Sequence, residues 1–152
     1  MKKLLATIAT AAALVTLNAA PAHAFGDVIM YQQVGTTKCF STFSGLSVSL
    51  ATCNPADTRQ QWSVGYYRFP QVHPMNVYTG TCLEHYATVR VLLNTCVSGG
   101  NQRWYTNSST GTYTIRIEPE KKCVEPTSSN GLRLDPCTAA STRWKEIVLV
   151  RG

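Results

Sequence analysis

The sequence has few charged residues and little histidine, and it lacks the motifs of the common enzyme classes. Charged residues make up 14% of the 152 positions, and only three histidines occur. There is no Gly-x-Ser-x-Gly elbow, no phosphate-cradling glycine loop and no His-Glu-x-x-His. No spacing of carboxylates indicates a pair placed across one cleft for glycoside hydrolysis. We therefore expect a protein that is not an enzyme.

Clustered basic residues and metal-binding cysteine motifs are also missing. The formal net charge is +6, but the basic residues of the chain after position 24 are scattered singly apart from Lys121-Lys122, so no nucleic-acid interface is expected. The six cysteines include no Cys-x-x-Cys pair and have no clustered histidines around them, which argues against the competing interpretation of a zinc site. The sequence therefore predicts neither a metal nor a cofactor.

A long apolar run occurs only at the N-terminus. Met1-Lys2-Lys3 is cationic, residues 4–20 are small and apolar, and Ala22-His23-Ala24 fits a signal-peptidase site. Residues 1–24 are therefore predicted to be a secretory signal of bacterial type, cleaved near Ala24, which makes the protein secreted or periplasmic. The alternative is a membrane anchor, but the run is rich in Ala and Thr and shorter than the roughly 20 strongly apolar residues that a spanning helix needs.

The remaining chain, residues 25–152, contains a threefold repeat. Its three tryptophans are 42 and 40 positions apart, and each follows a cysteine pair whose second member lies 14 positions after the first. The repeats cover approximately residues 27–67, 68–109 and 110–152. In an exported chain six cysteines indicate three disulfides, and the repeat singles out one pairing, within each unit. The predicted disulfides are Cys39–Cys53, Cys82–Cys96 and Cys123–Cys137.

Short alternating apolar runs indicate an all-β chain, because no apolar residues recur at helical spacing. A unit of about 40 residues could be a propeller blade, but three blades are too few to close around a channel. Three units of about four strands each, closed into one barrel with a cap, use the whole chain and leave no open edge. The sequence therefore predicts a β-trefoil, with three tryptophans in its core: Trp62, Trp104 and Trp144.

The repeated pattern Cys-apolar-x, apolar-x-apolar-x-x-Cys and Gln-x-Trp resembles the ricin B-type lectin domain. This resemblance covers all of residues 25–152 and implies a β-trefoil with up to three shallow sugar pockets, one in each repeat. In that family a pocket commonly combines an acidic residue two positions after the first cysteine, an aromatic platform, and an Asn just before the Gln of Gln-x-Trp. A carboxylate and an amide can bridge neighbouring sugar hydroxyls, while an aromatic face packs against the apolar side of the ring.

Only the second repeat keeps this set of residues together. The resemblance implies that its sugar-binding residues are Glu84, Asn101 and Gln102, with His85 or Tyr86 as the aromatic platform. Two departures from the family pattern are visible: Glu84 is longer than the usual Asp, and Asn94 stands where the aromatic often lies. An alternative is that Gln102 only bonds backbone and that Glu84 is a solvated loop carboxylate.

The first and third repeats have lost parts of the set. The first has Ser41 in place of the acid and Arg59 in place of the Asn. The third keeps an acid, Glu125, which makes it a weaker candidate, but Ser141 and Thr142 replace the Asn and Gln. We therefore expect sugar binding mainly through the second repeat.

Three functions are open at this point. The first is a secreted lectin that binds galactose-type or related sugars on glycans or glycoproteins. The second is a cell-binding or scaffold subunit of a multicomponent toxin, like the ricin-like subunits of cytolethal distending toxins, which would have toxin subunits as partners. The third is a trefoil protease inhibitor of Kunitz type, which gives no reason for a repeated Gln-x-Trp.

Overall fold

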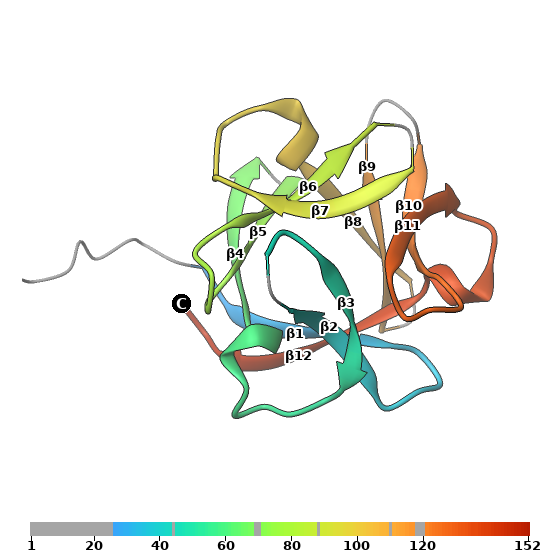
Figure 1. Ribbon diagram of the computed structural model, residues 1–152, viewed down its shortest axis with the longest axis horizontal. Helices are drawn as coiled ribbons and strands as arrows, with labels where there is room; N and C mark the ends of the chain where they lie inside the picture. Colours follow the sequence, from blue (N-terminus) through green and yellow to red (C-terminus); the bar gives the residue numbers. More distant parts are fainter. Residues whose placement is uncertain (1–25, 44, 69–70, 88, 110, 118–120) are drawn as a thin grey trace, which may run out of the picture.

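The computed structural model describes residues 26–152 except 44, 69–70, 88, 110 and 118–120. The predicted signal peptide, residues 1–24, lies outside the described residues. The described residues form twelve strands and three short 3-10 helices (Figure 1), and within them no helix is long and apolar enough to cross a membrane. The fold is therefore all-β, as predicted.

Each third of the chain repeats the same order of elements: a strand, a hairpin of two strands, a 3-10 helix, and a strand that starts at a tryptophan. The first third contains β1 (Val28–Gln33), β2 (Lys38–Thr42), β3 (Val48–Thr52), η1 (Thr58–Gln60) and β4 (Trp62–Arg68). The second contains β5 (Gln71–Asn76), β6 (Cys82–Tyr86), β7 (Arg90–Asn94), η2 (Gly100–Gln102) and β8 (Trp104–Ser109). The third contains β9 (Thr112–Ile117), β10 (Lys122–Pro126), β11 (Leu132–Pro136), η3 (Ala140–Thr142) and β12 (Trp144–Val150).

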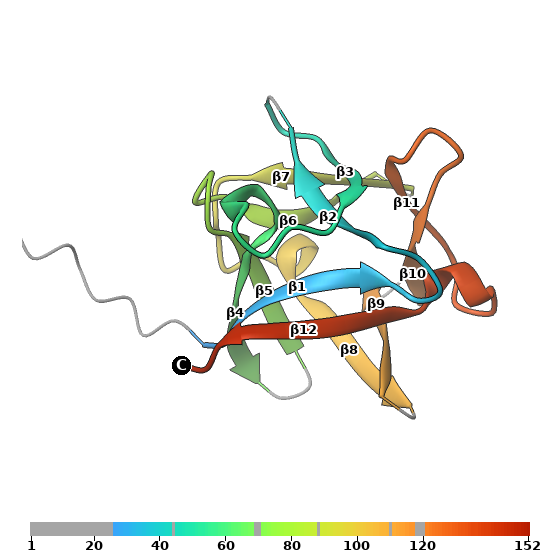
Figure 2. The same ribbon diagram turned by 90° about the horizontal axis from the view of Figure 1, so that it is seen from below.

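Six strands close into a barrel, and the other six cap one end of it. Around the barrel β1 pairs with β4, β4 with β5, β5 with β8, β8 with β9, β9 with β12, and β12 with β1, all antiparallel. The hairpins β2–β3, β6–β7 and β10–β11 stand together at one end (Figure 2). This closed ring with a triple-hairpin cap is the β-trefoil that the repeat predicts.

The buried tryptophans form the base of each hairpin. Trp62, Trp104 and Trp144 are each 0% exposed. The indole Nε1 of Trp104 donates to the carbonyl of Leu83 at 2.8 Å, and that of Trp144 donates to the carbonyl of Val124 at 3.1 Å. Both acceptors lie one position after the first cysteine of their repeat, so in the second and third repeats the Trp holds the first strand of its own hairpin.

The three predicted disulfides are present, one in each repeat. Each ties the start of the first hairpin strand to the loop after the second strand, with Cα atoms 5.0, 5.0 and 4.9 Å apart. In the chain-entropy model, closing a loop of this length stabilises a domain by about 3 kcal/mol. The bonds therefore fix the ends of the hairpins that carry the candidate sites.

Adjacent hairpins are joined in a ring by three equivalent backbone hydrogen bonds. The amide of Leu50 donates to the carbonyl of Asn130 at 2.7 Å, that of Leu93 to Leu46 at 2.8 Å, and that of Leu134 to Val89 at 3.0 Å. Each donor lies three positions before the second cysteine of its repeat, and each acceptor lies near the hairpin tip of a neighbouring repeat. Every hairpin is thus held by both of the others.

Candidate functional site

The hairpin β6–β7 has a buried face and an outer face, because successive strand residues point to opposite sides. Leu83, Val91 and Leu93 are buried in the core, at 0%, 7% and 0% exposure. On the outer face lie the residues between them and their cross-strand partners, in the pairs Cys82–Asn94, Glu84–Leu92 and Tyr86–Arg90. The outer face carries the acid of the predicted sugar site.

Two amides hold the carboxylate of Glu84. Gln102 Nε2 donates to Oε2 at 2.7 Å, and Asn94 Nδ2 donates to Oε1 at 3.2 Å. The Glu84 residue is only 9% exposed, so the two bonds keep its side chain in one position. A carboxylate has about four lone-pair sites, so two neutral donors leave acceptor capacity for hydroxyl groups of a ligand. Among the described residues no cation pairs with Glu84.

Gln102 lies beneath the site rather than in its wall, because its side chain is 0% exposed. Its Oε1 accepts from the amide of Val97 at 2.9 Å, and its Nε2 also donates to the carbonyl of Thr95 at 2.8 Å. The same side chain therefore fixes the loop after the second cysteine and orients Glu84. Asn101 precedes it on η2, which packs against β6, and Asn101 is exposed.

The structure separates the two aromatic candidates. His85 is 7% exposed and lies on the inner face with Leu83, whereas Tyr86 is 56% exposed and follows Glu84 by two positions on the outer face. A residue two positions along a strand is roughly 7 Å away on the same side of the sheet. Of the two, only Tyr86 is exposed on the face of the hairpin that carries Glu84.

The third repeat uses its acid differently. Glu125 accepts a hydrogen bond from the hydroxyl of Ser141 and forms an ion pair with Arg133 at 3.2 Å, and Arg133 also pairs with Asp135 at 2.8 Å. The hydrogen bond from Ser141 and the charge of Arg133 hold the pKa of Glu125 below its ordinary value, against the opposing effect of burial. The negative charge of this carboxylate is therefore compensated by an arginine of the protein itself.

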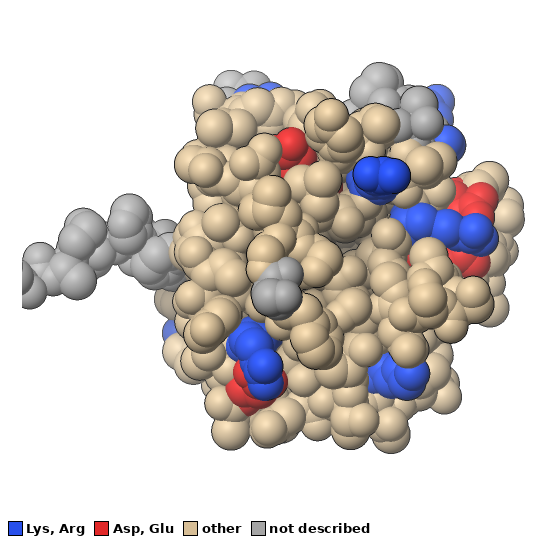
Figure 3. All heavy atoms as spheres, viewed as in Figure 1, with Lys and Arg blue, Asp and Glu red and all other residues tan. Residues whose placement is uncertain are grey.

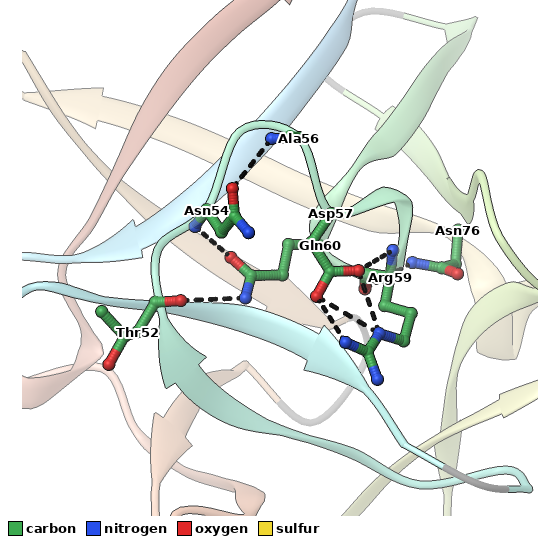
Figure 4. Close-up of polar contacts among 7 residues, drawn as sticks. All are labelled: Thr52, Asn54, Ala56, Asp57, Arg59, Gln60 and Asn76. Carbon is green, nitrogen blue, oxygen red and sulfur yellow. Dashed lines mark hydrogen bonds and ion pairs between the residues drawn. The ribbon is translucent and has the colours of Figure 1, made fainter.

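The first repeat has no acid at this position, since Ser41 stands there and is 2% exposed. Arg59 stands at the position that Asn101 and Ser141 occupy in the other two repeats. Figure 4 shows that Arg59 folds back onto Asp57, with its Nη2 2.8 Å from the Oδ2 of Asp57. This contact lowers the pKa of Asp57, chiefly through the side-chain hydrogen bond. Gln60 bonds the amide of Asn54 and the carbonyl of Thr52, as Gln102 bonds its own loop (Figure 4).

Two partners of the acids lie outside the family pattern. Asn94 stands where that pattern often has an aromatic residue, and it donates a hydrogen bond to Glu84. Arg133 forms an ion pair with Glu125, the acid of the third repeat. Both lie on the second hairpin strand at positions that share a face with the acid, so strand register alone could have pointed to them.

A closed six-stranded barrel, three capping hairpins and a carboxylate held by the Gln of Gln-x-Trp define a β-trefoil domain of the lectin type. In sequence, residues 58–135, just over half of the chain, match the family described as ricin-type beta-trefoil lectin domain-like. The chain belongs to this family, which supports carbohydrate binding as its general activity. No curated protein sequence matches the chain.

Solved structures agree with this fold. The designed threefold-symmetric protein ThreeFoil is similar with a TM-score of 0.73 and 13% identity, over 80% of this chain and 99% of that one. SeviL bound to asialo-GM1 saccharide is similar with a TM-score of 0.67 and 12% identity, over 80% and 97%. The Haemophilus ducreyi cytolethal distending toxin is similar with a TM-score of 0.66 and 15% identity, over 82% and 85%. At these identities the similarity establishes the fold alone.

Proposed function

We propose that this protein is a secreted, non-catalytic lectin that binds galactose-type or related sugars on glycoconjugates, mainly through its second repeat. One observation carries the proposal: Glu84 is held by two neutral amides, whereas Glu125 is neutralised by an arginine and the first repeat has no acid. A carboxylate that no cation occupies and that has free lone pairs is the acceptor that sugar hydroxyls require.

The binding geometry follows from the outer face of β6–β7. Glu84 accepts hydrogen bonds from two neighbouring hydroxyls, and the exposed Asn101 amide bonds one of the same hydroxyls. Tyr86 packs against the apolar side of the ring. Gln102 and Asn94 position the acid, and His85 supports the strand from its inner face. A single shallow site binds weakly, so high avidity on a cell surface requires several copies of the chain.

A glycan array with the oxidised mature protein tests the proposal first. Titration with the sugar that binds most strongly on the array then compares the affinities of Glu84→Gln and Asn101→Ala with that of the matched control Glu125→Gln. We expect Glu84→Gln to weaken binding by about tenfold or more, because it removes hydrogen bonds to a charged acceptor worth roughly 1.5–3 kcal/mol. The control protein should bind like the wild type. No binding to any glycan, or equal loss in the control, would contradict the proposal.

A second candidate function is a cell-binding or scaffold subunit of a multicomponent toxin. It is favoured by the loss of two of the three sites, which leaves those surfaces for protein partners, and by the similarity in fold to a cytolethal distending toxin chain. Purification of the native protein distinguishes the two functions. Co-elution with an enzymatic chain supports the toxin subunit, and an isolated chain that binds glycans supports the lectin.

A further inference from the structure

A shallow pocket lies where the three hairpins meet, beside the candidate sugar site. Its volume is about 510 Å³, and residues of all three repeats line it, among them Leu46 and Ser47 of the first, Arg90 and Leu92 of the second, and Leu132 of the third. Most of the described lining residues are aliphatic, and Arg90 is the one cation among them. This combination suits a ligand group that is both apolar and negatively charged.

Arg90 also belongs to a row of cross-strand neighbours that runs over the cap. Tyr86 pairs with Arg90, Arg90 with Arg133, and Arg133 with Glu125, across β6, β7, β11 and β10. Directly paired residues share one face of a sheet, and adjacent strands are about 4.8 Å apart. Arg90 therefore lies one strand from the Tyr86 platform, and its Cα is about 7–8 Å from that of Glu84, its diagonal neighbour.

The two arginines of this row differ in their partners. Arg133 is paired with Glu125 and Asp135. Arg90 is exposed and makes no ion pair or side-chain hydrogen bond within the part of the chain that the structure describes. Figure 3 shows this face of the molecule, where charged side chains are few on a largely uncharged surface. The positive charge of Arg90 is thus left for a ligand.

We infer that the sugar site extends across the hairpin to Arg90 and the pocket, and that this extension takes an acidic, N-acylated sugar residue joined to the sugar held at Glu84. The guanidinium pairs with the sugar carboxylate in a bidentate manner, and the acyl methyl group lies against Leu46 and Leu92. This inference rests on the proposed lectin function. The extension makes the protein bind a glycan with a terminal acidic sugar more tightly than the same glycan without that sugar.

Calorimetric titration with lactose and with lactose that carries a terminal sialic acid tests the inference. The wild type should bind the sialylated sugar about tenfold more tightly, and the preference should shrink at high salt. Arg90→Gln should remove the preference and leave lactose affinity unchanged. Lys145→Gln, which removes an exposed positive charge on the barrel strand β12, is the matched control and should keep the preference.

A second variant tests the apolar half of the extension. Leu46 is 57% exposed at a hairpin tip, so Leu46→Ser should not disturb folding. We expect it to weaken the binding of sialylated lactose about threefold and to leave the binding of lactose unchanged. Equal binding of the two sugars by the wild type, or a preference that survives Arg90→Gln, overturns the inference and leaves the lectin function standing. If the protein binds neither of the two sugars nor any glycan on the array, the lectin function itself is overturned.

Discussion

Glu84 in the second repeat and Glu125 in the third occupy the same position of the same hairpin, two residues after the first cysteine. Across the strand pair Glu84 faces Leu92, and Glu125 faces Arg133. Gln102 bonds Glu84 in the second repeat, and Thr142 stands at the equivalent position of the third. A fold with threefold symmetry thus offers three equivalent positions. The partners of the carboxylate at each position decide whether it is open to a ligand or already paired within the protein.

The comparison can be sharpened by rebuilding the third site. A quadruple variant with Arg133→Leu, Asp135→Asn, Ser141→Asn and Thr142→Gln gives the third repeat the partners that Glu84 has in the second. We expect a second, weaker sugar site with Kd in the range of about 1 mM, because the aromatic platform is still missing. Two sites per chain in an NMR titration would confirm this, and Glu125→Gln in the variant should remove only the new one. A stoichiometry that stays at one would contradict the assignment of the acid and its partners.

The two buried glutamines provide the next test. Gln60 and Gln102 make the same bonds to backbone, but only Gln102 also bonds a carboxylate. Replacing either by Ala leaves buried polar groups unpaired, at a cost of about 1–3 kcal/mol. Gln102→Ala should destabilise the protein by about 1–2 kcal/mol more than Gln60→Ala, since Glu84 also loses a charge-assisted bond. Urea unfolding measures both, and only Gln102→Ala should reduce sugar binding.

The smallest expected effect is a pH dependence in the third repeat. The pKa of Glu125 is lowered in the folded protein, so this group contributes stability above its unfolded pKa of about 4.3, and that stability is lost as the pH falls through the folded pKa. Ser141→Ala removes the largest cause of the lowered pKa. It should cost about 1 kcal/mol near pH 7 and less below about pH 4. Urea unfolding across this range checks it, with the exposed Thr138→Ala as control; a cost that does not change with pH would contradict the explanation.

Much of the fold could be predicted from the spacing of two residue types. Cys and Trp fix the repeat, the repeat fixes the disulfides, and three alternating units leave the closed barrel as the solution without open edges. The arrangement of the candidate site was harder to predict. Gln102 falls on a site motif, yet its complete burial comes from the packing of η2 against β6. His85 and Tyr86 are adjacent in sequence, and only strand register shows which of them faces outward.

The partners of each acid could not be predicted from the family pattern, because they come from the opposite strand. Leu92 and Arg133 occupy the same register position, and both are compatible with a strand. Whether an arginine there pairs with the acid depends on side-chain geometry that spacing does not contain. The same holds for Arg90, which becomes distinctive only when Arg133 is seen to be paired already.

The ring of hydrogen bonds between the hairpins makes the geometry of the proposed sugar site depend on all three repeats. Leu93, on the strand behind the site, is fixed by the tip of the first repeat, and Val89, at the site's own tip, is fixed by the third. The first and third repeats, which lack part of the proposed set of site residues, therefore still fix the position of the hairpin that carries Glu84. Loss of the binding residues in a repeat leaves its structural contribution to the neighbouring hairpin in place.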